Sequence, residues 1–585
     1  MIDNVKKVFT QKTGAWLTVY ALEQLPVSYT FGIPGVHNTE LYDELSNSNT
    51  IQPILVTHEC GAAFMADAVS RTSNGIGVLV IVPAAGITHA MSGIGEAFLD
   101  GIPMLIISGG IRKDTDNCFQ LHDIDHHALL KTITKKTYLI KSHKEIVPTL
   151  FEAYSVAISG EPGPVYIELP VNIQLFKGDI DDISIYQPQQ YNPPRIDHER
   201  IRLAAELLIK SKSPGLFLGW GCKDCQSICI EIAELLQCPV ATTLQGFSVF
   251  PGTHPLHTGM GFGGSSVPAA ENAFHDCDCL LAVGTRFSEI PTGSFGVRVP
   301  EHLIHIDINP HVFHKNYPAK IAIHADAEQA LNMLLKELKT YSTRRDGEII
   351  RRQIDQHKQA YLNEWFEHKG TRVNPARFFA SLRTHLSDDA IVVVDDGNHT
   401  FLTAELLTTD KQNQLICPTD FNCMGYCVPA AIGAKLANMN KQVIGIVGDG
   451  AFLMTCMELI TASTNNLGIV YFVFYDGELS QIAQGQEIPY NRKTCTILGN
   501  IRLQGIAEAT GSAYLEMITN EEIDTQINQA FQLADKGQPV IVDIKMDYSK
   551  RTRFTKGLVK TVIGRFPLGD KFRFIGRAMV RRVTG

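Results

Sequence analysis

The chain has 585 residues, a net charge of −9 and 44% hydrophobic residues, which suits roughly three or four soluble domains. The negative net charge gives no reason to expect nucleic acid as a partner. The N-terminus lacks the apolar stretch of a signal peptide, and no apolar run reaches the roughly 18–20 residues that span a membrane, so we expect a cytoplasmic protein.

Three regions alternate helical patterns with short apolar runs bounded by Gly and Pro, such as VLVIVP, LFLGWG and VIGIVGDG. Such runs are typical of strands buried on both faces of a parallel sheet. We therefore predict an α/β protein of three domains, 1–185, 196–340 and 370–548, each with a mainly parallel sheet flanked by helices. A Pro/Gln-rich linker over 186–194 separates the first two, and a charged helix over 343–369 leads into the third. The first and third domains look like variants of one design.

Two acidic turns follow neighbouring strands of the third region: Gly448-Asp449-Gly450, and a turn that contains Asp476. In a right-handed crossover both strand ends open at the same edge of the sheet, so the two carboxylates can converge. Two such oxygens and a carbonyl make half of an octahedral Mg²⁺ shell, which phosphate oxygens and water complete. The glycines let the backbone approach a diphosphate. The N-terminus of a helix predicted from about Leu453 to Thr464 favours the negative charge of that diphosphate. The plainer alternative is a tight turn after a strand.

A GDG motif followed about 27 residues later by a second turn resembles the cofactor motif of thiamine-diphosphate (ThDP) enzymes of the acetolactate synthase, pyruvate oxidase and 2-oxo acid decarboxylase family. FNCMGYCVPAAIGA and DDGNHTF are similar to segments of acetolactate synthase large subunits. The resemblance implies ThDP and Mg²⁺, with Asp449, Asp476 (usually Asn in the family) and the carbonyl of Glu478 as metal ligands. It also implies cofactor contacts at Gly397, Asn398, His399, Met424, Gly448, Gly450, Ala451 and Phe452.

In the first region, VTHECGAAFMADAVSR resembles the pyrimidine-binding domain of the same family, which implies that Glu59 is the carboxylate that activates the cofactor. ThDP must lose the proton at C2 of its thiazolium, and a carboxyl group bonded to the aminopyrimidine promotes that loss. His89 replaces an Asn near the cofactor in the family. The family's active-site Gln falls on Gln120 or on His122, depending on the end from which residues are counted, and the sequence leaves this register open.

Nearby, the pair His126-His127 matches no catalytic register, so we favour surface or helix positions for both histidines. In acetolactate synthases the acceptor pocket has a Trp where this chain has Gly485, and a Met where it has Gln481. Removing a large aromatic wall predicts a wider and more polar pocket.

The resemblance implies decarboxylation of a 2-oxo acid, with pyruvate as the expected donor, and carboligation to a second carbonyl to give an acyloin or acetolactate-like product. The alternatives are a true acetolactate synthase, an FAD-dependent pyruvate oxidase and a non-catalytic cofactor-binding subunit. In the family Glu59 and Asp449 lie on different subunits, which implies a homodimer or homotetramer with active sites at the subunit interface.

The middle region resembles FAD-binding domains and also flavin-free ones, so the sequence leaves FAD open. Its Gly219-Trp220-Gly221 turn is too short a pattern to decide this. We expect Cys222, Cys225 and Cys229 to be small buried hydrophobes rather than zinc or redox residues.

Residues 549–585 form a basic tail in which eleven Lys or Arg stand against one acid, so the tail carries +10 and the remainder −19. Phe572, Ile575 and Met579 recur at helical steps with arginines between them, while the Gly and Pro residues of 564–569 predict that any helix is short. We favour packing of the tail over the acidic body or the active site. The sharper alternative is peripheral contact with an anionic membrane.

Overall fold

The computed structural model describes residues 10–180, 183–188, 193–341 and 345–584. These residues form three six-stranded sheets, each parallel throughout, and one two-stranded antiparallel ribbon, β1 (Thr10–Thr13) with β8 (Lys177–Ile180). The chain divides into two compact units, of which the first holds the described residues up to 188 together with Phe421–Asn440 and Thr455–Leu467. The second unit holds the remaining described residues. The three-domain α/β architecture predicted from the sequence is confirmed, whereas its boundaries remain a prediction.

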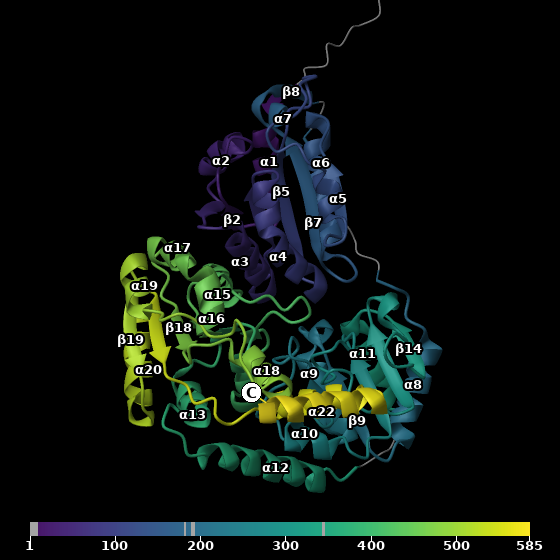
Figure 1. Cartoon of the computed structure of the whole chain (residues 1–585). Coiled ribbons are helices and arrows are strands. Elements are labelled where there is room, and N and C mark those ends of the chain that lie inside the picture. The colour runs from purple at the N-terminus through teal and green to yellow at the C-terminus, as the bar shows by residue number, and fades with distance from the viewer. Residues whose placement is uncertain (1–9, 181–182, 189–192, 342–344, 585) are drawn as a thin grey trace, which may run out of the picture. The chain divides into compact units, whose positions relative to one another are not determined.

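The sheet of the first unit has the order β3-β2-β4-β5-β7-β6. Its strands are β2 (Tyr29–Gly32), β3 (Gln52–Leu55), β4 (Gly77–Ile81), β5 (Met104–Gly110), β6 (Lys136–Leu139) and β7 (Pro164–Pro170). One face is covered by α1 (Gly14–Glu23), α2 (Thr39–Ser46) and α6 (His143–Ile158). On the other face lie α3 (Glu59–Thr72) and α4 (Ala85–Asp100), as Figure 1 shows. Two short helices, α5 (His126–Leu130) and α7 (Val171–Leu175), complete this part.

Helix α15 (Cys427–Ala437) also belongs to the first unit and packs along α3. The two helices approach closely because Gly433 has no side chain: a Cβ there would lie 2.2 Å from the carbonyl oxygen of Met65. Both helices are almost entirely buried, which explains why their sequences are rich in Ala, Gly and Val and lack a polar face.

The middle sheet lies in the second unit and has the order β11-β10-β9-β12-β13-β14. Its strands are β9 (Pro214–Leu218), β10 (Val240–Thr242), β11 (His257–Met260), β12 (Cys279–Val283), β13 (His302–Asp307) and β14 (Ile321–His324). Its α-helices are α8 (His198–Lys210), α9 (Gln226–Leu236), α10 (Pro268–Ala273) and α11 (Ala327–Leu338). The charged helix expected over 343–369 is α12 (Glu348–Phe366). Residues 342–344, where that helix was expected to begin, and residues 189–192 of the expected linker lie outside the described part.

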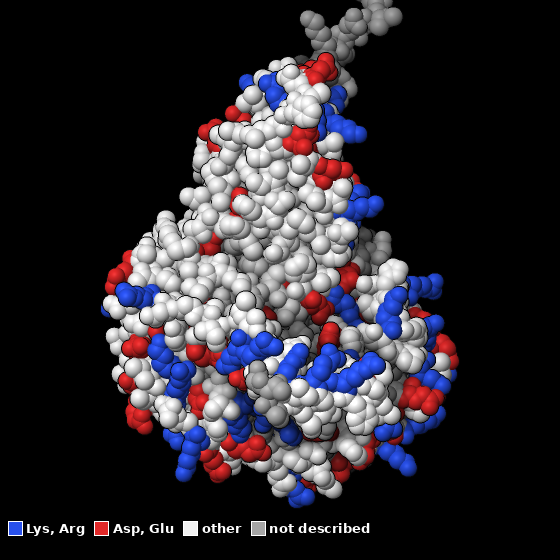
Figure 2. All heavy atoms as spheres, in the orientation of Figure 1, with Lys and Arg blue, Asp and Glu red and all other residues white. Residues whose placement is uncertain are grey.

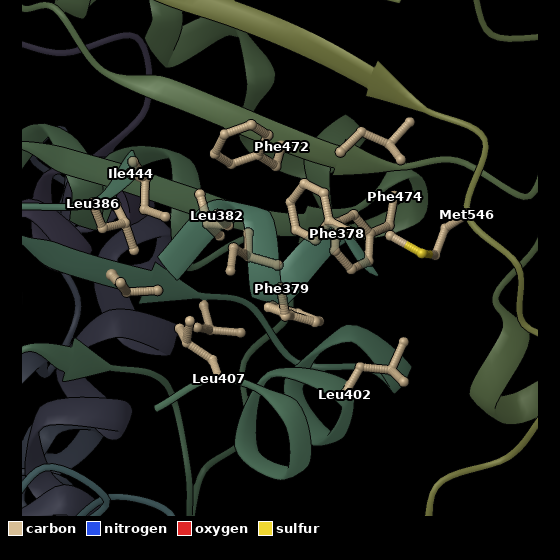
Figure 3. Packing of buried hydrophobic residues seen from close by; sticks show 14 of the residues in the cluster. Phe378, Phe379, Leu382, Leu386, Leu402, Leu407, Ile444, Phe472, Phe474 and Met546 are labelled. Atoms are coloured by element: carbon tan, nitrogen blue, oxygen red, sulfur yellow. The ribbon is translucent and has the colours of Figure 1, made fainter. Parts of the chain in front are cut away.

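The third sheet has the order β16-β15-β17-β18-β20-β19. Its strands are β15 (Ile391–Val394), β16 (Leu415–Ile416), β17 (Val443–Gly448), β18 (Val470–Phe474), β19 (Ala513–Met517) and β20 (Val540–Ile544). Phenylalanines of α13 (Pro375–His385) pack on those of β18, as Figure 3 shows. Numbered along the chain, the first and third sheets share the strand order 2-1-3-4-6-5, which confirms that they are variants of one design.

The helix predicted from Leu453 to Thr464 ends where expected but begins earlier. It starts as α16 (Asp449–Thr455) and passes through a 3₁₀ turn, η3 (Cys456–Glu458), into α17 (Leu459–Thr464). The remaining helices of this region are α14 (Asn398–Leu406), α18 (Ser480–Tyr490), α19 (Leu503–Thr510) and α20 (Ile523–Ala534).

The basic tail forms two helices, α21 (Arg553–Arg565) and α22 (Leu568–Thr584), within the second unit. Helix α22 is longer than the sequence led us to expect, because Gly569 falls inside its first turn rather than interrupting it. No helix in the described ranges has both the length and the apolar character needed to cross a membrane.

Candidate functional site

The two predicted metal ligands stand at the carboxyl ends of adjacent strands. Gly448 of β17 is the register partner of Phe474 of β18, so Asp449 and the turn at Asp476 lie at the same sheet edge. The Oδ2 atom of Asp449 accepts hydrogen bonds from the backbone N–H groups of Gly477 at 2.7 Å and of Asp476 at 3.3 Å. The predicted convergence of the two acidic turns is therefore confirmed.

The electrostatics of this edge favour a cation. Burial, followed by the neighbouring Asp476, raises the pKa of Asp449 to about 7, and burial likewise raises the pKa of Asp476. Two buried carboxylates held together in this way are costly unless a positive charge neutralises them. The carbonyl oxygen of Glu478 accepts the N–H of Ser480 at 2.9 Å and its hydroxyl only at 3.5 Å, because that hydroxyl donates mainly to Asp476 Oδ2. These residues fit Mg²⁺.

The start of α14 leaves two buried polar atoms without a partner beside this edge. Asn398 and His399 are buried, and Asn398 Nδ2 and His399 Nε2 have no partner within the protein. Burial lowers the pKa of His399 to about 3, so its ring is neutral. The ring lies against Gly448, where a Cβ would be 3.0 Å from Nδ1. Buried polar groups without partners indicate a missing ligand, and a helix start suits a diphosphate.

The other predicted contacts of this region surround the same turn. Gly450 lies close to Leu479, because a Cβ at Gly450 would be 2.4 Å from its Cδ2 atom, and Ala451 and Phe452 are buried within α16. Asp449 also accepts the N–H of Gly450 at 2.8 Å. The Gly397 N–H donates to the Thr400 hydroxyl at 3.0 Å, which orders the start of α14.

Glu59 is the first residue of α3 and is only 6% exposed. Its Oε2 atom lies 3.0 Å from Nδ1 of His89, which α4 supplies. The His89 ring stacks on His58, with ring centroids 4.6 Å apart. The structure thus joins two predicted catalytic residues and adds His58, which the sequence analysis did not single out. It also adds Glu458, whose carboxylate accepts hydrogen bonds from Thr57 and His58.

The predicted cofactor support, Met424, precedes α15 and is half-buried. The next residue, Gly425, has φ +85°, and its carbonyl accepts the Thr455 hydroxyl at 2.8 Å. Met424 thus lies just before a helix of the first unit that packs along α3, the helix that begins with Glu59.

The two alternatives for the family's glutamine differ in their surroundings. Gln120 donates to the carbonyls of Arg112 and Asn117, both within its own loop. His122 instead has its ring 5.0 Å from that of His37, in the loop after β2. The assignment of either residue to the cofactor stays a prediction.

The histidine pair has a structural role that the sequence analysis did not foresee. His126 lies in a helix, as expected, but it is buried rather than on the surface. Its Nε2 atom accepts the N–H of Ala84 at 2.9 Å, and Ala84 adopts φ +50° just before α4. Although burial opposes ionisation of Glu168, His126 and His127 beside it lower the pKa of that carboxyl to about 2. His126, held beside Glu168, therefore fixes the start of the helix that carries His89.

The predicted acceptor residues Gln481 and Gly485 lie on α18. A Cβ at Gly485 would have no atom within 4 Å, so this position opens onto free space. The Oε1 atom of Gln481 is buried without a partner. Both observations agree with a pocket that lacks an aromatic wall.

The middle sheet has the strand order of dinucleotide-binding folds, but its glycine turn is satisfied internally. Gly219 N donates to Val283 at 2.9 Å, and Gly221 N donates to Gly284 at 3.2 Å. A Cβ at Gly221 would be 2.6 Å from Gly284 Cα. As it stands, this turn does not fit a flavin diphosphate.

Cys222, Cys225 and Cys229 are buried in the core of the middle sheet, as expected for small hydrophobes. Among the described residues, no three His, Cys, Asp or Glu side chains form a group that could hold a metal ion. A metal at the Asp449 edge would therefore need phosphate or water ligands as well.

Three models of the thiamine pyrophosphate (ThDP) enzyme family match the chain. They are the N-terminal TPP binding domain over residues 12–132, the central domain over 201–334 and the C-terminal TPP binding domain over 395–544.

Curated relatives are similar over nearly the whole length. A probable acetolactate synthase large subunit of Methanocaldococcus jannaschii is 32% identical over 91% of this chain and 92% of its own. The acetolactate synthase large subunit of Corynebacterium glutamicum is 30% identical (91% and 86%), and isozyme 3 of Escherichia coli is 28% identical (92% and 95%). The chain therefore belongs to the thiamine pyrophosphate enzyme family and is a ThDP-dependent enzyme similar to acetolactate synthase large subunits.

Proposed function

We propose that this enzyme binds ThDP through Mg²⁺, decarboxylates a 2-oxo acid, with pyruvate as the favoured donor, and joins the remaining fragment to a second carbonyl. The observation that carries the proposal is the edge where Asp449 and Asp476 converge beside the unpartnered amide of Asn398 and the buried ring of His399. An anion and a cation bound together would satisfy both sets of groups, as a metal diphosphate does.

At this edge Asp449, Asp476 and the Glu478 carbonyl would hold Mg²⁺, and the Asn398 amide at the start of α14 would donate to the diphosphate, with the neutral ring of His399 beside it. When bound, ThDP supplies the carbon nucleophile and the electron sink for loss of CO₂. Glu59 holds and exchanges a proton at N1′ of the aminopyrimidine, in a buried position where such exchange is readily tuned.

His89 lies 3.0 Å from the Glu59 carboxyl, so we assign it to orient that group and to pass protons between it and solvent, because half of the His89 side chain is exposed. Met424 supports the cofactor, and Gln481 and Gly485 shape the acceptor side. The open space at Gly485 favours an acceptor bulkier than pyruvate and an acyloin product.

A second candidate is a true acetolactate synthase, in which the acceptor is another 2-oxo acid. The curated relatives named as acetolactate synthases at 28–32% identity favour it. Incubation of the enzyme, ThDP and Mg²⁺ with pyruvate and a panel of aldehydes and 2-oxo acids, followed by mass spectrometry, separates the two by product.

We further propose a homodimer or homotetramer in which Glu59 and Asp449 of different subunits serve one cofactor, as the family resemblance implies.

Glu59→Gln tests the catalytic assignment. The variant should bind ThDP with Mg²⁺ but lose most C2 proton exchange, because Gln cannot exchange a proton with N1′. Exchange at the wild-type rate, followed by NMR, would remove Glu59 from the mechanism.

The tail supports one further proposal, contact with an anionic membrane. Phe572 and Met579 on α22 are 73% and 63% exposed, and Figure 2 shows a row of Lys and Arg side chains over this helix. An exposed apolar edge beside a cationic one is typical of helices that lie in a membrane surface.

A further inference from the structure

The carboxylate of Glu458 holds the start of α3, immediately before the proposed catalytic residue Glu59. Glu458 is 1% exposed and follows α16 in the turn η3, within the first unit. Its Oε1 atom accepts the Thr57 hydroxyl at 2.7 Å, the His58 N–H at 3.0 Å and the Thr57 N–H at 3.1 Å. Its Oε2 atom accepts the Thr461 hydroxyl at 2.9 Å.

These contacts place a negative charge at the first turn of α3. A Cβ at Gly61 would lie only 2.4 Å from Glu458 Oε1, so the carboxylate rests directly against that turn. Burial raises the pKa of Glu458, but each hydrogen-bonding partner described above is a donor, and an acceptor-only carboxylate satisfies them all. Glu458 also contributes, after burial, to raising the pKa of Cys60 to about 12, so its field reaches the residue next to Glu59.

A helix N-terminus stabilises a nearby anion, and Glu59 occupies the first helical position. A helix start by itself stabilises the charged form of a carboxylate over the neutral form. The proposed mechanism needs a carboxyl group that both gives and takes a proton. The carboxylate of Glu458 is bound to the same helix start, so its negative charge opposes the stabilisation that the helix gives to a second negative charge there.

We propose that Glu458 is a positioning residue for Glu59: it fixes the start of α3 and counters the helix field there, so that Glu59 exchanges its proton readily. The inference rests on the proposed role of Glu59. The sequence around Glu458, an ordinary Met-Glu-Leu segment, carries no motif that would indicate this role.

The ionisable groups near the carboxyls of Glu59 and Glu458 include two histidines, a tyrosine and a cysteine. His89 and His58 stack beside Glu59. Burial and then Glu59 raise the pKa of Tyr42 well above its usual value, and Cys60 also stays neutral near pH 7. The two histidines are therefore the ionisable groups that contact the Glu59 end of this pair, while Tyr42 and Cys60 stay neutral.

The test is Glu458→Gln in the full-length enzyme loaded with ThDP and Mg²⁺. Gln keeps an acceptor oxygen for Thr57 and His58 but removes the charge. We expect ThDP affinity by calorimetry to stay close to wild type. C2 proton exchange, measured by NMR after acid quench, should slow by about three- to tenfold near pH 7, and the acid limb of the exchange profile should move to lower pH.

Two further variants keep the inference falsifiable if Glu458→Gln folds poorly. Thr57→Val removes one donor and leaves the charge less compensated, so the acid limb should move in the opposite direction, to higher pH. Thr72→Val, whose hydroxyl donates to the Ala68 carbonyl at the other end of α3 and does not contact Glu458, serves as the matched control with little movement.

An acid limb that stays at the wild-type pH in both Glu458→Gln and Thr57→Val would overturn the inference. The same holds if exchange falls only in proportion to lost ThDP affinity. If Glu59→Gln itself exchanges like wild type, the proposed function fails instead, so the two failures are distinguishable.

Discussion

A buried acid on α4 provides a sharp test of how the first unit is stabilised. Glu96 is fully buried, and its Oε2 atom accepts the Cys423 N–H at 3.1 Å. Nearby, Arg71 binds Asp100 at 2.9 Å and Asp67 at 2.7 Å, so three carboxyls surround one guanidinium. Burial and then Asp100 raise the pKa of Glu96 to about 9. At pH 7 the folded chain therefore holds Glu96 as a neutral acid.

The sign of the effect follows from proton linkage. The unfolded chain ionises Glu96 near pH 4.5, whereas the folded chain keeps it protonated until about pH 9. Stability from this group is therefore complete below about pH 4.5 and is lost as the pH rises toward 9. At about 1.4 kcal/mol per pH unit, the loss by pH 7 is at most about 3 kcal/mol, and by pH 5 less than about 1 kcal/mol.

Glu96→Gln replaces the neutral acid by an uncharged group of the same shape that keeps an acceptor oxygen for Cys423. It should be more stable than wild type at pH 7, by several degrees in the thermal midpoint, and the difference should shrink toward pH 5. Calorimetric midpoints of both proteins from pH 5 to 9 give this comparison. Glu96→Ala, which leaves the Cys423 N–H without its acceptor, should be less stable at pH 5. A difference between Gln and wild type that does not change with pH would refute the reasoning.

Three further predictions concern the proposed site and the tail. Asp449→Ala should lose most of its Mg²⁺-dependent ThDP affinity, because the diphosphate is then poorly neutralised; unchanged calorimetric affinity would argue against the metal site. Gly485→Trp should fill the open space on α18 and shift product from bulky acyloins toward acetolactate, whereas an unchanged product ratio with two competing acceptors would contradict the pocket assignment. Full-length protein should sediment with anionic vesicles more than with neutral ones, and removal of 551–585 should abolish the difference; equal recovery in all supernatants would leave only the packing role.

The sequence was sufficient to predict those features of the fold in which a local pattern follows from a single physical rule. Buried Val and Ile runs bounded by Gly predict parallel strands, and two acidic turns after adjacent strands predict converging carboxylates. Both are found, because chain direction in a parallel sheet leaves little freedom in where strand ends lie.

The sequence was insufficient where a role depends on long-range contact. Glu458 holds Thr57 across 401 residues, and His126 holds Ala84 across 42; neither pairing has a local signal. The start of α16 was also placed too late, because Gly450 lowers helix propensity although the helix begins at Asp449. The length of α22 was likewise underestimated, because the helix accommodates Gly569 in its first turn and Gly576 in its interior.

The tail also contributes to the second unit beyond its charge. Glu405 of α14 accepts the N–H of Phe554 at 2.9 Å and of Arg553 at 3.1 Å, and Phe554 stacks on Phe401 with ring centroids 4.0 Å apart. Arg581 donates to the Pro489 carbonyl at 3.2 Å, on α18. Packing of the tail on the second unit, which the sequence favoured, is thus confirmed by contacts on two helices that carry proposed site residues.

The discontinuous make-up of the first unit has a consequence during synthesis. Its sheet is finished well before Pro193, but α15 and the segment up to Leu467 join it from much later in the chain. At about 5–20 residues per second, the ribosome needs on the order of tens of seconds to deliver them. Throughout that interval the apolar face of α3, including Met65, stays uncovered, because α15 has not yet been synthesised. The nascent chain should therefore be a substrate for chaperones at this stage, and a fragment that ends before residue 421 should expose this face permanently.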